Sequence, residues 1–132
     1  DTVSWSPMLA VGWRAFLKGE VLESPRFDVG GVHGVRLLFY PQGDAAAPAG
    51  RCSVFLAVPD GKQVTFELSV NDDHAKRTTH AFTQAAANFG WLDMAPAAEA
   101  YEAVSLQVMR AGPLHGLAAS FWQVMRRAGA AG

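Results

Sequence analysis

Two short stretches of the sequence carry the residue types of a metal site and of a phosphate loop. Asn71-Asp72-Asp73-His74 offers oxygen and nitrogen ligands, but it follows an alternating apolar stretch, and Asn and Asp favour turns at such a strand end. Zinc also needs ligands gathered from separated positions, which four consecutive residues do not supply. Gly30-Gly31-Val32-His33-Gly34 precedes a predicted strand and not a helix, so no helix N-terminus is available for a phosphate. We therefore expect a solvated turn at the first stretch and no nucleotide site at the second.

The nucleophiles in the chain lack the partners that covalent catalysis requires. Cys52 is the single cysteine, so it forms no internal disulfide, and it lies on a predicted core strand where burial raises the thiol pKa. The sequence has Ser, His and Asp residues but no Gly-x-Ser-x-Gly elbow to present a serine. We expect a non-catalytic protein with no metal ion and no cofactor.

The composition fits one folded domain and disfavours several classes of function. The chain has 132 residues, of which 50% are hydrophobic and 17% charged, so it has material for a core and too few charges for a disordered protein. A net charge of -1 gives no electrostatic attraction to nucleic acid. No apolar run reaches the ~18–20 residues of a membrane helix. Because the sequence begins at Asp1 with no signal-like start, we expect a domain of a longer protein.

Strands must position these residues, because alternation with a period of two dominates most of the chain. The stretches 35–40, 52–58, 64–70 and 104–109 are the main predicted strands, and 11–17 and 26–29 are weaker candidates. We expect 52–58 and 64–70 to pair as an antiparallel hairpin, since Asp60 and Gly61 suit a turn. Stretch 35–40 is apolar on both faces apart from Arg36, so it should be central. Short strands with Gly and Pro turns predict an antiparallel β-sandwich. The expected core residues are Trp13, Phe27, Leu37, Val54, Leu56, Phe66, Leu68 and Leu106.

The pattern changes to a helical one after Gly112-Pro113. Leu114, Leu117, Phe121 and Met125 fall on one helical stripe, and Pro113 suits a helix start. We therefore predict a sandwich over residues 1–112 and a C-terminal helix or linker over 113–132. The helix is expected to pack on the sandwich, with a homo-oligomerising segment as the alternative.

Several segments stand in a characteristic order along the chain: Trp13, Ser24-Pro25-Arg26-Phe27-Asp28-Val29-Gly30-Gly31, Arg36-Leu37-Leu38-Phe39-Tyr40-Pro41-Gln42-Gly43-Asp44, Ser53-Val54-Phe55-Leu56, Thr65-Phe66-Glu67-Leu68, His80-Ala81-Phe82 and Phe89-Gly90-Trp91. Taken in this order, they resemble the MATH family, whose name stands for meprin and TRAF homology and which is also called TRAF-like. The resemblance covers about residues 11–109. A Val stands at 35 where the family usually has Trp, the order Phe-Gly-Trp is the reverse of the usual one, and one Ala is extra within 85–87, so the chain is similar to a divergent member.

The resemblance implies an all-β, eight-stranded antiparallel β-sandwich, to which the predicted C-terminal α-helix would be an addition. It also implies an adaptor that binds short extended peptides of partner proteins in a shallow groove, with no nucleic-acid or membrane partner. Family members act in the ubiquitin pathway and in receptor signalling, so the implied location is intracellular and cytoplasmic, with a nuclear location as the alternative. The implied peptide-binding residues are Phe55, Val64, His80, Asn88, Phe89, Gly90 and Trp91.

The alternation supports part of this site and leaves part of it open. If Val54 and Leu56 face the core, Phe55 faces outward, as a ligand-binding aromatic would, although it could also pack beneath a loop or the C-terminal helix. Gly90 would let a peptide backbone approach closely, whereas its aromatic neighbours could belong to the groove or to the core. Alternation places Val64 in the core, while the resemblance places it at the groove. The alternative function is a structural or self-association domain whose groove is lost or covered.

Overall fold

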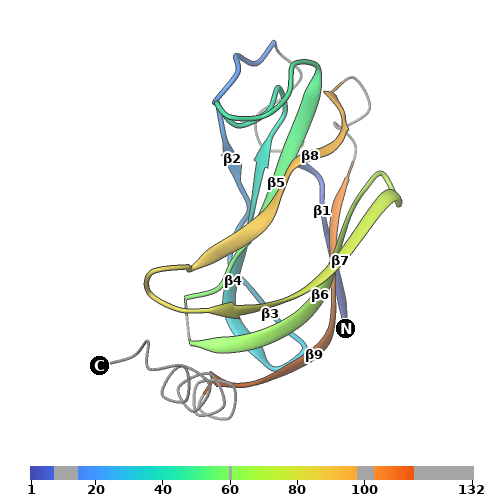
Figure 1. Cartoon of the computed structure of the whole chain (residues 1–132). Coiled ribbons are helices and arrows are strands. Elements are labelled where there is room, and N and C mark those ends of the chain that lie inside the picture. Colours follow the sequence, from blue (N-terminus) through green and yellow to red (C-terminus); the bar gives the residue numbers. More distant parts are fainter. Residues whose placement is uncertain (8–14, 60, 98–102, 115–132) are drawn as a thin grey trace.

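The computed structural model describes residues 1–7, 15–59, 61–97 and 103–114, and these form an all-β protein. The strands are antiparallel and lie in two sheets (Figure 1). The first sheet has the order β1-β9-β6-β7, formed by Thr2–Trp5, Val104–Pro113, Lys62–Val70 and Asp73–Phe82. The second has the order β2-β4-β5-β8, formed by Leu22–Glu23, Val32–Tyr40, Arg51–Ala57 and Asn88–Pro96, and β3 (Phe27–Val29) also pairs with β4.

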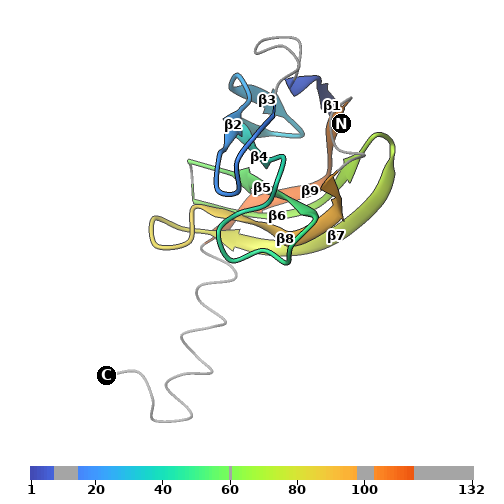
Figure 2. The ribbon, with the colours of Figure 1, turned by 90° about the horizontal axis from the view of Figure 1, so that it is seen from above.

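The short strands β2 and β3 are two pieces of one sheet edge, because both pair with β4. Between them, Ser24 closes the gap: its amide donates to the Leu37 carbonyl over 2.9 Å, and the Leu37 amide donates to its hydroxyl oxygen over 2.8 Å. With this edge counted once, the described strands are consistent with the predicted eight-stranded sandwich. Figure 2 shows β1, β2 and β3 at one side of the molecule and β7 and β8 at the opposite side.

The core lies between the two sheets and follows the predicted alternation. The expected core residues Leu37, Val54, Leu56, Phe66, Leu68 and Leu106 are all fully buried, and Phe27 is partly buried against them. Trp13, the remaining expected member, lies outside the described residues. The strand predicted over 35–40 is β4, which is flanked by β2 and β3 on one side and by β5 on the other, so its central position is confirmed.

The predicted hairpin of 52–58 with 64–70 is wrong. These stretches are β5 and β6, and they belong to different sheets: β5 pairs with β4 and β8, while β6 pairs with β7 and β9. Alternation specifies which face of a strand is buried but not which strand lies beside it. The partner that β6 reaches through a tight turn is β7, and Asn71 and Asp72 adopt φ angles of 55° and 59° there. The predicted turn at this stretch is therefore confirmed.

The last described strand is longer than expected. β9 continues to Pro113, so this proline ends a strand where we expected it to start a helix. The predicted C-terminal helix falls almost entirely on residues 115–132, which lie outside the described residues. In the described ranges, no helix has the length and apolar character that crossing a bilayer requires.

Candidate functional site

Strand β8 is the open edge of the second sheet, and it is unusually apolar for an edge. In the described part of the chain its only strand partner is β5, so the N–H and C=O groups on its other side have no strand opposite them. Phe89 and Leu92 on this strand are 38% and 39% exposed. The edge of the first sheet, β7, instead carries Lys76 and Arg77, as edges that avoid pairing usually do.

The second half of β8 is partly blocked, whereas the first half is open. The Asp93 carboxylate pairs with Arg51, and its carbonyl oxygen accepts a hydrogen bond of 2.7 Å from the Lys76 ammonium. Pro96, which has no N–H to donate, ends the strand. Residues 88–92 are therefore the part of this edge that is best placed to accept another strand.

The register of β8 on β5 divides the predicted site between two faces of the sheet. Phe55 pairs with Gly90, and side chains of directly paired residues point to the same face, which here is the outer one. Trp91 and Phe89 pair with the buried residues Val54 and Leu56, so they lie on the inner face. Phe55 is thus not brought onto one face with Phe89 and Trp91, because they lie on opposite faces of the sheet.

On the inner side of the edge, the structure joins Phe89 to His80 of β7. Their rings stack with a centroid distance of 4.3 Å and an angle of 13°, and the His80 ring also meets Phe82 edge-on at 4.6 Å. His80 Nε2 lies 3.3 Å from the Ala86 carbonyl oxygen, which orients the ring. Trp91 lies deeper, with its ring centroid 6.1 Å from that of Phe66. Trp91 therefore fixes β8 to the core, while Phe89 and His80 form the accessible margin.

Two of the predicted residues pack closely against the chain's own strands. Val64 is fully buried opposite His80, so alternation placed it correctly and its side chain is not available at a groove. A Cβ atom at Gly90 would meet the Val54 carbonyl oxygen and lie 2.6 Å from Phe55 Cα. The close backbone approach that we expected from a peptide is thus made by the chain's own strand β5.

The outer face of the second sheet carries a group of rings and apolar side chains. Phe55 is half-buried and meets Tyr40 in a T-shaped contact with centroids 5.8 Å apart. Leu38, Phe55 and Gly90 are in register across β4, β5 and β8. The sequence analysis found Phe55 but missed Leu38 and Tyr40, although the same alternation in β4 points them outward. We name this surface the aromatic face, and its members are Arg36, Leu38, Tyr40, Phe55, Ala57, Asn88, Gly90 and Leu92.

Two titratable groups of this sheet have raised pKa values because they are buried. Burial raises the pKa of the fully buried Cys52 thiol from its ordinary value of 9.0 to about 11, so at neutral pH it is a protonated core residue, as expected. Burial, followed by the negative charges of Asp44 and Glu23, also raises the pKa of Tyr40. Its phenol therefore stays protonated and can donate a hydrogen bond. Over the ranges that the structure describes, no three His, Cys, Asp or Glu residues gather into a possible metal site.

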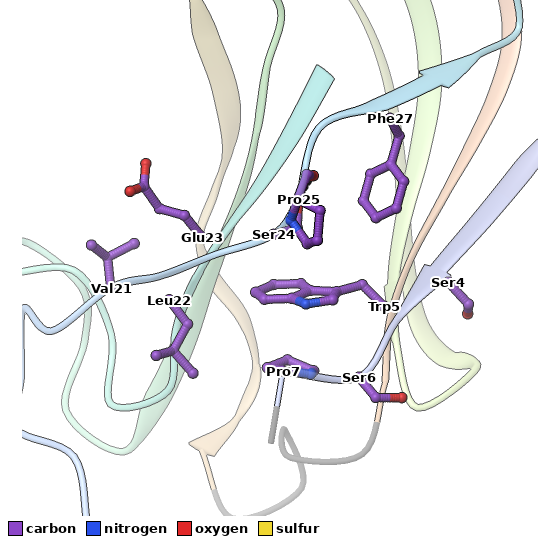
Figure 3. Close-up of a pocket in the computed structure, with 10 residues that line it drawn as sticks. All are labelled: Ser4, Trp5, Ser6, Pro7, Val21, Leu22, Glu23, Ser24, Pro25 and Phe27. Carbon is purple, nitrogen blue, oxygen red and sulfur yellow. Dashed lines mark hydrogen bonds between the residues drawn. The ribbon is translucent and has the colours of Figure 1, made fainter. Parts of the chain in front are cut away.

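A wide cleft lies on the opposite side of the sandwich, between β1 and the edge formed by β2 and β3. It has a volume of about 790 Å³, and sequence reasoning did not find it. Figure 3 shows the Trp5 indole between Pro7 and Pro25, with Phe27 nearby. Of its described lining residues, Glu23 alone is charged, so the cleft offers little polar chemistry to a ligand.

Neither protein-family models nor curated protein sequences give a match to this chain. The resemblance to the MATH family therefore rests on the ordered sequence segments, and the all-β sandwich architecture is consistent with it.

Proposed function

We propose that this domain is a non-catalytic protein-interaction module of the MATH type, which binds an extended peptide as an additional strand on the open side of β8. The observation that carries the proposal is the apolar, unpaired edge over residues 88–92, where Phe89 and Leu92 are exposed. Peptides that add to a sheet edge gain affinity from main-chain hydrogen bonds and specificity from pockets for alternate side chains.

The two faces of β8 offer separate surfaces to the side chains of an added strand. Side chains of an added strand would alternate, one set lying over the aromatic face and the other set against Phe89 and His80. Gly90 stands between Phe55 and the open edge, and because it has no side chain, no group on β8 at that row shields the Phe55 ring from the peptide. Asn88 is exposed at the start of the edge, and its carboxamide can both donate and accept hydrogen bonds.

The expected interaction is small and of moderate affinity. A short peptide on one strand edge lies at the low end of interface sizes, for which micromolar dissociation constants, about -8 kcal/mol, are reasonable. Such an affinity suits an adaptor that recruits partner proteins reversibly. An intracellular adaptor role, including one in the ubiquitin pathway, is the biological setting that the resemblance implies.

Self-association is the second candidate function, and the same edge favours it. An open, apolar strand edge is a template for a strand from any chain, including β8 of a second copy. Two copies would then form a continuous sheet, and the peptide site would be occupied by the partner.

Selection from a library of extended peptides, followed by titration of the best binder, tests the proposal. Truncating a central aromatic contact typically costs ~2 kcal/mol or more, so Phe55→Ala and Phe89→Ala should each weaken binding about thirtyfold. Thr79→Ala, on the outer face of the first sheet, is the matched control and should bind like the unaltered chain. Trp91→Ala is unsuitable, because Trp91 packs on the core.

Sedimentation of the full chain separates the two candidate functions. A monomer that binds a selected peptide supports the interaction module. A dimer that Leu92→Lys dissociates, with no peptide selected, would replace it by self-association. A monomer that selects no peptide would contradict both functions.

A further inference from the structure

A second cleft opens on the aromatic face, at the end where Asn88 lies. It has a volume of about 320 Å³. Arg36, Ala57 and Asn88 form one row across β4, β5 and β8, because Arg36 pairs with Ala57 and Ala57 pairs with Asn88. The small Ala57 side chain leaves a hollow between a guanidinium group on one side and a carboxamide on the other. The residues that line the cleft are Glu23, Arg26, Gly34, Arg36, Leu38, Ala57, Val58, Pro59, Ala87 and Asn88.

The described lining of this cleft has more positive than negative charge. It contains two arginines, Arg26 and Arg36, against one carboxylate, Glu23. The Arg36 and Glu23 side chains approach only to 3.8 Å between Nη1 and Oε1, and they are 35% and 55% exposed. Arg26 donates to the Gly34 carbonyl oxygen over 3.2 Å, which leaves its charge without a carboxylate at that contact. The cleft therefore favours an anionic group.

Arg36 also holds a polar atom that the fold does not satisfy. Its Nε is buried and has no hydrogen-bond partner among the residues that the structure describes. A buried donor without a partner is costly and uncommon in folded proteins, so its presence calls for an explanation. A guanidinium group matches a carboxylate by two parallel N–H···O bonds, and a small movement of the Arg36 side chain would direct its fork at a ligand in the cleft.

We infer that this cleft is a carboxylate subsite that takes a Glu or Asp side chain of the bound peptide, with Arg36 as its ion partner and the Asn88 amide as a second donor. The inference rests on the proposed function and specifies which peptides it selects. A monoanion fits better than a phosphate group, because Glu23 opposes the second negative charge of a phosphate.

The subsite also predicts a spacing within the ligand. Ala57 follows Phe55 by two residues on the same strand face, so the subsite and the Phe55 ring are about 7 Å apart along the strand direction. An extended peptide places its residues i and i+2 at the same spacing and on the same side. Preferred ligands should therefore carry an acidic residue two positions from an apolar or aromatic one.

A set of labelled peptides with Phe and Glu two positions apart tests the inference on the full chain. The Glu→Gln peptide is nearly isosteric with the Glu peptide, and we expect it to bind about tenfold more weakly. Arg36→Gln should bind both peptides equally. The control is Arg77→Gln, because Arg77 lies on the first sheet and is 3.5 Å from Glu67; this variant should keep the tenfold preference. Thermal melts verify that each variant is folded.

The possible outcomes distinguish this inference from the proposed function. If a selected peptide binds but the Glu and Gln forms bind equally to the unaltered chain, the carboxylate subsite is wrong and the peptide site stands. If a phosphoserine peptide binds more tightly than the Glu peptide, and Arg36→Gln removes that preference, the site recognises phosphate and the assignment to carboxylate is overturned. If no peptide binds, the proposed function is wrong, and the carboxylate subsite that rests on it is wrong as well.

Discussion

The outer faces of the two sheets cover one common core, yet they differ in chemistry. On the first sheet, outward hydroxyl groups bind one another: the Ser4 and Ser105 oxygens lie 2.5 Å apart, and those of Thr65 and Thr79 lie 2.7 Å apart. On the second sheet, the corresponding positions form the aromatic face. We name the first surface the hydroxyl face, and its members are Thr2, Ser4, Thr65, Glu67, Ser69, Arg77, Thr79, Ser105 and Gln107.

The two faces differ in how far their side chains are paired with one another. A two-layer sandwich buries one face of each sheet, and the outward positions are free to be polar. The hydroxyl face is polar, and four of its hydroxyl groups form two hydrogen-bonded pairs. The aromatic face instead keeps half-buried rings and the unpartnered Arg36 Nε beside an open apolar edge. Exposed apolar surface of this kind is a common feature of binding sites.

Gly90→Ala should give the largest loss of stability. This variant tests whether the aromatic face depends on close contact between β8 and β5. The added Cβ would lie 2.6 Å from Phe55 Cα, and backbone atoms cannot move aside as a flexible side chain can. We expect a loss of about 3 kcal/mol in the free energy of unfolding, at the upper end of overpacking costs. Urea unfolding followed by fluorescence measures it.

Gly112→Ala is the matched control for this change. Gly112 lies in β9 opposite Gln63, on the outer side of the first sheet, and a Cβ there has no heavy atom within 4 Å. Its stability should equal or slightly exceed that of the unaltered chain, because alanine restricts the unfolded state more than glycine does. Equal stability of the two variants would mean that β8 can shift on β5, and the contrast between the faces would weaken.

At alkaline pH the protein should lose stability through Cys52, which lies in the second sheet. Below pH 9 the Cys52 thiol is protonated in both the folded and the unfolded chain. Between pH 9 and about 11 it ionises only in the unfolded chain, because burial raises the pKa in the folded one. The free energy of unfolding should therefore fall with rising pH in this window, by about 2 kcal/mol in total.

Urea titrations at pH 8, 9 and 10 measure this fall, and Cys52→Ala identifies its source. The variant should start from a lower stability, because it leaves a small cavity, but its stability should decline less steeply with pH. The raised pKa of Tyr40 adds a loss of the same sign at higher pH, which Tyr40→Phe would remove. A Cys52→Ala variant with the same slope as the unaltered chain would show that the thiol is not responsible.

The sequence predicts the faces of the strands better than it predicts their neighbours. Alternation correctly placed Leu56 and Phe66 in the core, because burial is decided residue by residue along one strand. It missed β7 and β8, since an edge strand buries little and its pattern is weak: β7 carries Lys76 on the side where its neighbour β6 has the fully buried Leu68. Strand pairing depends on residues far apart in the chain, and so the hairpin prediction failed.

The candidate site was predictable in its residue types but not in its geometry. Phe55 was identified as outward from its neighbours alone. That Tyr40 and Gly90 are its neighbours was not predictable, because they come from β4 and β8, whose register on β5 only the folded structure defines. The cleft between Arg36 and Asn88 needs three strands in register, so no local pattern could reveal it.

The smallest expected effect compares one arginine from each face. Arg77→Met removes an exposed ion pair with Glu67, and such pairs contribute roughly 0–1 kcal/mol, so its stability should fall slightly or not at all. Arg36→Met removes a similarly weak pair with Glu23 but also removes the buried, unpartnered Nε, whose burial costs about 1 kcal/mol. The second variant should therefore be as stable as the unaltered chain or up to about 1 kcal/mol more stable.

The sign of this difference bears on why Arg36 is present. A residue kept for a ligand can carry a cost in stability, so Arg36→Met should gain stability while it loses the preference for acidic peptides. Paired urea titrations of the two variants at neutral pH measure the difference, and raised salt should affect only the small ion-pair contributions. A clear loss of stability in Arg36→Met, larger than that in Arg77→Met, would instead make Arg36 a structural residue of β4. The charge of Arg36 would then be explained by its contribution to folding, and the carboxylate subsite would lose its main support.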